Sequence, residues 1–533
     1  MKQYQDSNKW FYADLLNGLF PYAIILVMGL LIFGPSLKFN FLNFDDNIYV
    51  YENPFVQSGL RWSNIIKAFT ESHGGHWHPL SWISHMLDVE FFGMNPFWHR
   101  GHNIFLHILN TCLLYLLICP RLLPKWLALL AVCIFLVHPL RIESVVWIAE
   151  RKDVLSVFWG LMTLVFYFQY TNTARARFLF FSLLSYAASL LAKPTFVTLP
   201  LLLFLLDVTP LRTLPPASKR MSIFEKLPFV VLAFVSTTTA ILAQNHDGGL
   251  KDVSAYTLAS RFNNVPTSYL TYLGKLIWPE SVAIFYPFQI YPPGIGMGTL
   301  LGLLALSYLL YHQRRKQAGL FLGWLWFLVS LLPMIGLIQI GGQAYADRWT
   351  YVPHLGLIVG LVATFHSSGW PSKKLYVFLV AYITLLSVKT LHELPNWKDS
   401  ESIFRHTLVV SPDNFMAYTN LGRALEEQGR ISEALENYRR AVHLRPQYPT
   451  ALNNLGSALA KTQRFPEAKE YFQRALKVAP DFISARYNLG LLEFYTGNLD
   501  LAERLWQETL EKDPHYAPAI ESLRHITSTA LPH

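Results

Sequence analysis

Charge is scarce in most of this chain. Of its 533 residues only 15% are charged, whereas 52% are hydrophobic and 15% are aromatic. An average soluble domain carries about 25% charged residues. The deficit falls in residues 15–390, and the C-terminal part is charged like an ordinary soluble domain. The composition therefore excludes a wholly soluble protein and predicts a polytopic membrane domain followed by a soluble domain.

Cysteine is rare too. The three cysteines, Cys112, Cys119 and Cys133, lie in or beside apolar runs, which excludes a disulfide framework and a paired-cysteine metal site. The first apolar run lacks a small-residue cleavage site after it, so we expect a retained span and not a signal peptide. The net charge of +9 comes from Lys and Arg in short loops between apolar runs. That pattern is typical of membrane topology, and no nucleic-acid partner is expected.

Eleven apolar runs are candidate membrane spans. A spanning helix needs about 17–25 residues. The longer runs are 17–34, 101–118, 153–170, 227–243, 296–312, 318–338, 351–367 and 374–391, and the shorter ones are 124–138, 177–192 and 194–207. With a cytoplasmic N-terminus, eleven spans place most Lys and Arg of the short loops inside, as membrane topology favours. A twelfth run, 268–278, is short and contains Lys275, so we interpret it as an interfacial helix.

The C-terminal part repeats every 34 residues. The repeated positions are Pro412, Pro446, Pro480 and Pro514; Leu421-Gly422, Leu455-Gly456 and Leu489-Gly490; Ala434, Ala468 and Ala502; and Tyr438, Phe472 and Trp506. This is the tetratricopeptide repeat (TPR) pattern of paired helices. It predicts three full repeats within 393–533, a half repeat before them and a capping helix at 517–529. Such arrays form a solenoid with a concave groove, which suits an extended peptide.

One asparagine per repeat precedes each Leu-Gly pair: Asn420, Asn454 and Asn488. Their spacing places one on the first helix of each repeat, toward the groove. Their amides could bind the backbone of an acceptor peptide without reading its sequence. Alternatively, asparagine is common at this position and is merely solvated.

Two adjacent carboxylates, Asp45 and Asp46, follow the first span, in a long outer loop rich in Phe, Trp and Tyr. Adjacent acids often cap helices or lie in solvated loops. Carboxylates at a membrane surface are costly, however, which favours a functional role. One of them could act as the general base on an acceptor hydroxyl.

The same loop contains His73, His76 and His78, three histidines that could bind zinc or stack on a sugar. No fourth ligand is apparent, so no metal is predicted.

Charged residues recur in the other outer loops. Arg and Lys at the outer surface suit a lipid phosphate, Arg through a bidentate fork and Lys as a point charge, although such residues also extend to lipid headgroups without a specific role. The candidates for the donor phosphate are Arg151, Lys152, Lys193 and Arg348. Further candidates for the substrate site are His78, His138, Glu143, Asp153, Asp347 and Tyr351.

Four motifs together resemble one family. They are Asn43-Phe44-Asp45-Asp46, the segment His138 to Asp153, the segment Asp347 to Pro353, and Asn396-Trp397 before the repeats. Across nearly the whole chain they look like the transmembrane and TPR-containing (TMTC) O-mannosyltransferases and their bacterial relatives. The resemblance implies an all-α GT-C glycosyltransferase fold over 1–392 and a TPR domain over 393–533. It also implies a polyprenyl-phosphate sugar as donor, an acidic residue at Asp45 or Asp46, a phosphate contact at Arg348, and no metal or other cofactor.

The resulting hypothesis is an inverting transfer of a sugar, with mannose as the first candidate, to a protein hydroxyl on the outer face of a bacterial inner membrane. The TPR domain would be periplasmic and would recruit the acceptor. The lipid phosphate is a leaving group that fixed positive charge can stabilise. Two alternatives remain: a lipid or glycan acceptor, and a non-enzymatic membrane-anchored TPR scaffold of an envelope complex.

Overall fold

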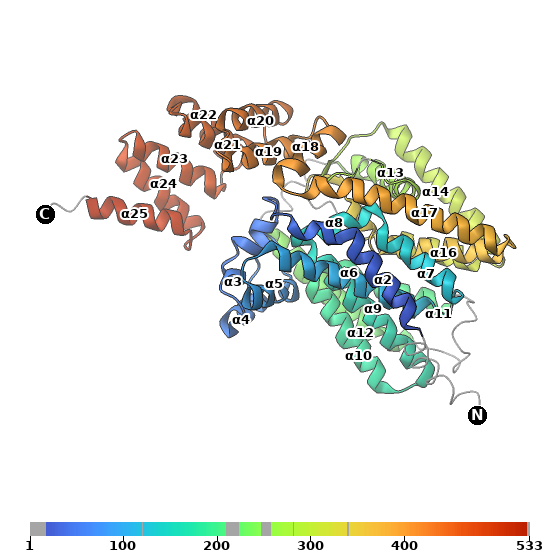
Figure 1. Ribbon diagram of the computed structural model, residues 1–533. Helices are drawn as coiled ribbons and strands as arrows, with labels where there is room; N and C mark the ends of the chain where they lie inside the picture. Colours follow the sequence, from blue (N-terminus) through green and yellow to red (C-terminus); the bar gives the residue numbers. More distant parts are fainter. Residues whose placement is uncertain are drawn as a thin grey trace. The chain divides into compact units, whose positions relative to one another are not determined.

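The computed structural model describes residues 18–119, 121–208, 223–246, 257–280, 282–337 and 341–529. The chain forms two compact units, Met1–Asp399 and Ser400–His533. Helices dominate both units, and the described residues contain two short strands, which confirms the all-α class (Figure 1). The first 17 residues, predicted to be cytoplasmic, lie outside the described ranges.

The first unit is a bundle of apolar helices. In chain order they are α2 (Leu19–Phe33), α3 (Pro54–Gln57), α4 (Trp62–Thr70), α5 (Pro79–Phe92), α6 (Pro96–Ile118), α7 (Lys125–Val137), α8 (Ile142–Val146), α9 (Arg151–Thr173), α10 (Ala176–Ala192), α11 (Leu199–Val208), α12 (Ile223–His246), α13 (Leu258–Ile277), α14 (Pro293–Gln313), α15 (Ala318–Leu331), α16 (Pro353–Ser367) and α17 (Ser372–Glu393). Short helical turns join them: η2 (Gly34–Lys38), η3 (Asn47–Tyr51), η4 (Pro139–Arg141), η5 (Ile148–Glu150), η6 (Pro194–Phe196), η8 (Asp347–Thr350) and η9 (Leu394–Trp397).

Six helical stretches of the described chain are long and apolar enough to cross a bilayer. They are Leu19–Lys38, Pro96–Ile118, Ile148–Thr173, Phe224–Gln244, Gly294–Gln313 and Ser372–Trp397. A seventh would be α7 together with Pro139–Val146, a pair bent by 59°, and α10, α15 and α16 are shorter apolar helices. The chain is therefore a membrane protein, while the count of eleven spans stays a prediction.

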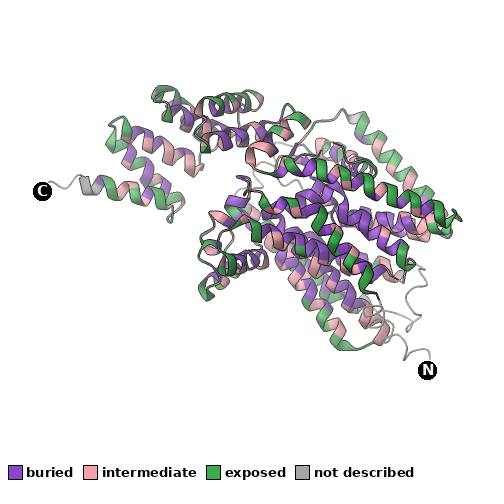
Figure 2. Ribbon diagram, viewed as in Figure 1, coloured by how far each residue is buried: buried purple, intermediate pink, exposed green. Residues whose placement is uncertain are grey.

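Burial separates central from peripheral spans. In α6, 61% of the most apolar window is buried, against 6% in α12 and 11% in α14, which expose apolar side chains along their length (Figure 2). Surface of this kind is suited to lipid. Between α15 and α16 the backbones touch, because a Cβ on Gly360 would lie 2.6 Å from the carbonyl oxygen of Gly319.

The segment predicted as a short interfacial helix differs in the structure. It is the end of α13, a helix of 20 residues, and Lys275 is buried there. Next to it, β1 (Tyr286–Pro287) pairs antiparallel with β2 (Gln343–Tyr345). The sequence did not reveal this because the partners of Lys275 lie far along the chain, as described below.

The second unit is a stack of paired helices. Its helices are α18 (Ser400–Val410), α19 (Phe415–Glu427), α20 (Ile431–Leu444), α21 (Pro449–Lys461), α22 (Phe465–Val478), α23 (Ile483–Tyr495), α24 (Leu499–Lys512) and α25 (Ala517–Thr529). The repeated glycines explain the pairing: a Cβ on Gly422, Gly456 or Gly490 would meet the ring of Tyr438, Phe472 or Trp506 at 2.6–2.8 Å. Each aromatic ring thus packs directly on the backbone of the preceding helix.

Candidate functional site

Asp45 and Asp46 lie between η2 and η3 in a loop held against Trp147. The Phe44 ring stacks on Trp147 at 5.4 Å, and the Trp147 indole donates a hydrogen bond to the Phe44 carbonyl oxygen at 3.0 Å. Asp46 is fully buried, and its carboxylate accepts hydrogen bonds from the backbone N–H groups of Leu42 (2.8 Å) and Ala149 (2.7 Å). Burial raises the pKa of Asp46 to about 7 although both hydrogen bonds lower it. Asp46 therefore joins the loop to η5.

Asp45 differs from its neighbour in backbone conformation and in hydrogen bonding. Its φ of 62° is left-handed, a conformation that Asp tolerates better than most residues. Its side chain is half-buried, and no described group donates a hydrogen bond to its carboxylate. Burial raises its pKa, Lys152 and Arg348 oppose that shift, and Glu150 adds to it. The Asp45 carboxylate therefore has no hydrogen bond from a described group and lies near several charged side chains.

These charges, here called the charged cluster, are Glu143, Glu150, Lys152, Asp153, Lys193 and Arg348. The Lys193 ammonium lies 3.0 Å from Glu150 and 2.6 Å from Asp153. The Lys152 ammonium lies 3.3 Å from Glu150 and 4.0 Å from the centre of the Tyr49 ring. Three segments that are distant in sequence thus meet, and they bring together half of the predicted phosphate and substrate candidates.

Arg348 enters the charged cluster from η8. Its backbone N–H donates to the Glu143 carboxylate at 2.7 Å, and its guanidinium pairs with the same carboxylate. Its Nε lies 3.3 Å from Glu150. Burial lowers the pKa of Arg348, but Glu143 and Glu150 raise it by more than burial lowers it, so the net pKa is raised and the guanidinium stays charged. Each cation of the charged cluster is therefore already paired with a carboxylate. An incoming phosphate would have to replace these carboxylates as the partner of the cations.

Asp347, also predicted at the substrate site, is fully buried and points elsewhere. Its carboxylate pairs with the Lys275 ammonium at 2.7 Å and accepts a hydrogen bond from the Tyr286 hydroxyl at 2.6 Å. Lys275 also donates to that hydroxyl at 2.6 Å. Asp347 therefore ties η8 to α13 and β1. Sequence analysis missed Lys275 and Tyr286, although a lysine in an apolar helix was the available signal.

The C-terminal end of η8, at Thr350 and Tyr351, is also fixed by hydrogen bonds. The Tyr351 hydroxyl is 2.6 Å from His107 Nδ1 and 3.3 Å from the Asn110 amide nitrogen. Arg141, a third residue that was not among the predicted site residues, donates to Thr350 Oγ1 at 2.8 Å. Tyr351 is thus a packed residue of the turn and does not reach the charged cluster.

Arg141 is unusual because it is fully buried without a carboxylate partner among the described residues. Its guanidinium faces the rings of Phe135 and Tyr351, each centre 5.2 Å away. Its Nε and Nη1 have no hydrogen-bond partner in the described structure. A cation in this setting adds positive potential near Asp347 and Asp153, and its burial without a paired carboxylate costs free energy.

Arg151, a predicted phosphate ligand, lies in another network. Its guanidinium is fully buried and bonds to Asp88 (2.6 Å), Ser84 (2.7 Å) and the His99 carbonyl oxygen (2.6 Å). Lys152, the next residue, points to Glu150 instead, because successive helical residues project about 100° apart. The structure therefore gives Arg151 a role in joining α9 to α5 and α6, away from Asp45.

One described group of histidines and carboxylates has metal-ligand spacing: His85, Asp88 and His99, whose nearest polar atoms lie within 4.8 Å of one another. Arg151 already supplies the positive charge to Asp88, so we assign no metal there. The three histidines weighed for zinc do not form such a group. His73 and His76 pair through their backbones, and His78 stacks on His76 and lies 3.1 Å from the Tyr49 hydroxyl.

His138 is also fully buried. Its Nε2 lies 3.0 Å from the Leu276 carbonyl oxygen, and its Nδ1 accepts a hydrogen bond from the Leu140 N–H at 3.3 Å. These contacts cap η4 and join it to α13. The structure thus places His138 among the packing residues of the bundle.

The asparagines of the repeats are half-buried and partly engaged. The Asn488 amide donates to Asn453 Oδ1 at 2.9 Å, and the Asn420 amide donates to the Met416 carbonyl oxygen at 2.9 Å. Asn454 accepts a hydrogen bond from the Asn453 amide at 3.3 Å. Each amide keeps further bonding capacity for a peptide.

The first unit ends beside the candidate base. The Lys398 carbonyl oxygen accepts a hydrogen bond from the Asn40 N–H at 3.0 Å, and the Trp397 ring lies 6.4 Å from Trp147. Trp147 also holds the Asp45 loop. The chain therefore leaves the membrane unit at the end of the bundle that carries Asp45.

The fold and the repeats define a membrane protein with a TPR array. Repeat models match residues 422–463 (TPR repeat) and 453–517 (tetratricopeptide repeat). The chain is 26% identical to the human protein O-mannosyl-transferase TMTC1, over 80% of this chain and 55% of that one. It is 25% identical to Drosophila melanogaster Tmtc1, over 76% of this chain and 59% of that one.

These relatives confirm the resemblance to the TMTC O-mannosyl-transferases. The chain spans little more than half the length of these curated relatives. Among solved structures, the crystal structure of MamA is similar at 25% identity and a TM-score of 0.22, over 23% of this chain and 72% of that one.

Proposed function

We propose that this protein is a GT-C glycosyltransferase that moves a sugar from a polyprenyl-phosphate donor to a hydroxyl group of a protein acceptor, with mannose as the first sugar to test. The proposal rests on one observation above the others: Asp45 offers a carboxylate without a hydrogen-bond partner in the described structure, near buried Lys152 and half-buried Lys193 and Arg348. The names of the similar proteins agree with such a reaction.

The chemistry follows from these groups. The acceptor hydroxyl attacks the anomeric carbon of the donor, the bond from that carbon to the phosphate oxygen breaks, and the phosphate leaves with the electron pair. Asp45 takes the hydroxyl proton, and Lys152, Lys193 and Arg348 stabilise the charge on the departing phosphate. Attack opposite the leaving group inverts the anomeric centre. An anomeric NMR assignment of the product tests this, and retention would contradict it.

Recruitment of the acceptor follows from the path of the chain. The last residues of the membrane unit lie beside the Asp45 loop, and the TPR unit begins at Ser400. An acceptor bound by the repeats is thereby delivered to the same side of the membrane as Asp45. We assign this side to the periplasm and the protein to a bacterial inner membrane, because most Lys and Arg of the short loops then face the cytoplasm.

The test uses purified protein with a panel of polyprenyl-phosphate sugars and a periplasmic extract as acceptor, and it measures release of polyprenyl phosphate. We expect release with one donor, and Asp45→Asn should slow it by about 10²- to 10⁴-fold, the contribution of a general base. Asn keeps the left-handed backbone and removes only the charge. Release that Asp45→Asn leaves intact would contradict the assigned base. No release with any donor, together with normal function of Asp45→Asn in cells, would favour the TPR scaffold.

A further inference from the structure

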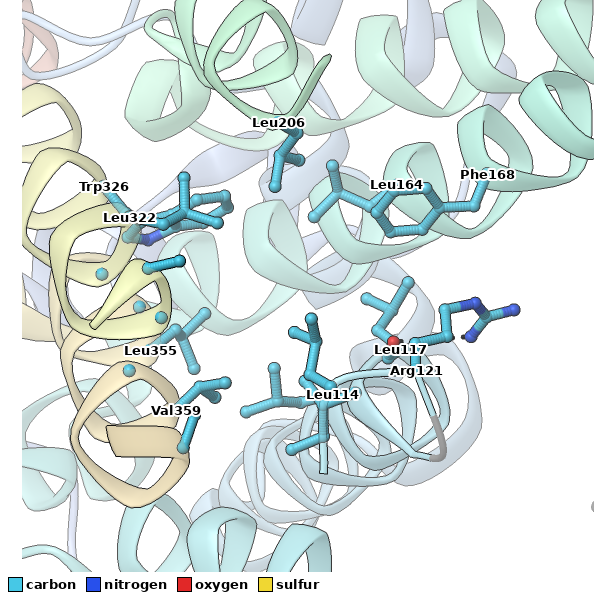
Figure 3. A pocket seen from close by; sticks show the side chains of 18 of the residues that line it. Leu114, Leu117, Arg121, Leu164, Phe168, Leu206, Leu322, Trp326, Leu355 and Val359 are labelled. Atoms are coloured by element: carbon cyan, nitrogen blue, oxygen red, sulfur yellow. Dashed lines mark hydrogen bonds between the residues drawn. The ribbon is translucent and has the colours of Figure 1, made fainter. Parts of the chain in front are cut away.

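A pocket of about 320 Å³ lies inside the first unit, away from the charged cluster. Its walls come from α6 and α9 on one side and from α15 and α16 on the other (Figure 3). Leu114, Leu164, Leu322, Leu355 and Val359 point into it, as Figure 3 shows. Walls of this kind offer water few partners and are suited to hydrocarbon.

Charge is confined to one end of the pocket. Of the described residues that line it, only Arg121 and Lys316 are charged, and both are cations. Arg121 follows the C-terminal end of α6, and Lys316 precedes α15. Lys316 is exposed and makes no ion pair with a described residue. The nearest acid in sequence, Asp207 after Leu206, is already paired with Lys226 at 2.5 Å.

This charged end lies opposite the candidate active site. Asp45 and the charged cluster lie at the N-terminal ends of α6 and α9, where Asn103 and Arg151 make a hydrogen bond. Arg121 lies beyond the other end of α6. Along α16 the pocket runs from Leu355 to Ser367, a helical length of about 18 Å, so it extends through much of one leaflet.

We propose that this pocket binds one acyl chain of an anionic phospholipid, whose phosphate lies between Arg121 and Lys316. The apolar walls take the chain, and Arg121 and Lys316, the charged residues of the described lining, attract a negative headgroup. The bound chain would fill the space between the α6–α9 side and the glycine-packed pair α15 and α16. The site is independent of the transfer reaction proposed above.

The test measures lipid binding to the purified, delipidated full-length protein by native mass spectrometry. The probes are phosphatidylglycerol and phosphatidylcholine with identical chains. We expect the wild type to prefer phosphatidylglycerol. Lys316→Gln should weaken phosphatidylglycerol alone by about fivefold, the effect of roughly one cation near an anionic headgroup. Arg315→Gln, an exposed neighbour outside the pocket, is the matched control and should bind as the wild type does.

A second variant tests the chain itself. Val359→Trp fills the pocket and should reduce binding of both lipids at least tenfold, whereas Val377→Trp, on the exposed face of α17, should have no effect. Wild-type lipid binding by Val359→Trp, or no headgroup preference in the wild type, would overturn the proposal. So would polyprenyl phosphate displacing phosphatidylglycerol with the same dependence on Val359, because the pocket would then hold the donor chain.

Discussion

At the scale of single residues, Asp45 and Asp46 are adjacent in sequence and opposite in environment. The Asp46 carboxylate accepts two backbone hydrogen bonds, whereas the Asp45 carboxylate accepts none from the described residues. Asn has one side-chain oxygen and one NH2 group, so in Asp46→Asn the NH2 group must face one of the two buried backbone N–H donors. We therefore expect the free energy of unfolding to fall by about 1–3 kcal/mol and the Tm to be lower. Asp45→Asn should leave the Tm unchanged. Thermal unfolding in detergent checks both, and equal Tm values for the two variants would contradict the division of roles.

The pH dependence of transfer tests the base through its neighbour Lys152. Burial raises the pKa of Asp45, and Lys152 is the strongest influence that lowers it. A base works deprotonated, so the rate should fall as the pH drops through this raised pKa. Lys152→Gln removes the opposing charge, raises the pKa further and should move the acid limb of the kcat profile to higher pH. The profile is measured at saturating donor concentration.

Lys67→Gln is the control for this shift, because Lys67 lies between the same two spans as Asp45, over the Phe55 ring, and is not among the main charges that act on Asp45. Its acid limb should coincide with that of the wild type. If the acid limb of the kcat–pH profile of Lys152→Gln coincided with that of the wild type, the group that titrates there would not be Asp45.

The sequence predicted residue roles unevenly. It singled out Arg348, Lys193 and Lys152, which the fold brings together because they end segments on one side of the bundle. It also grouped Arg151 with them, but one step along a helix turns the side chain toward Asp88. Sequence alone shows that a charge lies near a membrane surface, and only the helical phase fixed by tertiary packing shows which way it points.

At the scale of elements, the turn that carries Arg348 is fixed from several sides. Lys275 and Tyr286 hold Asp347, Glu143 holds Arg348, and Arg141 holds Thr350. These partners come from α13, β1, α8 and η4. A guanidinium fixed in this way can stabilise a departing phosphate without first being ordered. The partners of the turn are therefore positioning residues for the proposed reaction.

Tyr286→Phe tests this positioning. It removes one hydroxyl that donates to Asp347 and accepts from Lys275, and it keeps the ring that stacks on Tyr345. We expect kcat to fall about tenfold with little change in the KM for the donor, because a less firmly fixed Arg348 stabilises the departing phosphate less well. Tyr345→Phe leaves these bonds intact and should stay within twofold of the wild type. Equal kinetics for the two variants would show that the turn needs no such support.

Elements were predictable where a local rule decides them. The 34-residue period placed all repeat helices, because each glycine needs its aromatic partner within the same repeat. The long apolar runs likewise predicted six spans that the structure describes. The end of α13 was misjudged because Lys275 argues against burial, and its counter-ion Asp347 lies 72 residues away. Long-range ion pairs of this kind leave no local pattern.

At the scale of the whole molecule, the chain joins a membrane unit, which contains the charged cluster, to a unit of TPR repeats. The junction lies at the Asp45 end of the first unit, which Asn40, Trp147 and Trp397 hold together. If the repeats recruit the acceptor, weakening the groove should affect only the use of large acceptors. The donor chemistry of the membrane unit should continue unchanged.

Substituting Asn420, Asn454 and Asn488 together by Ala in the full chain tests this division. Three amides that each contribute about 0.5–1.5 kcal/mol should raise the KM for a protein acceptor at least about tenfold, while the kcat with a short peptide acceptor stays as in the wild type. Asn437→Ala is the control, because Asn437 lies on the second helix of a repeat, outside this row of asparagines. A triple variant with an unchanged KM and Tm would exclude this row as the acceptor contact. A fall in kcat with both acceptors would instead mean that the repeats act on the membrane unit itself.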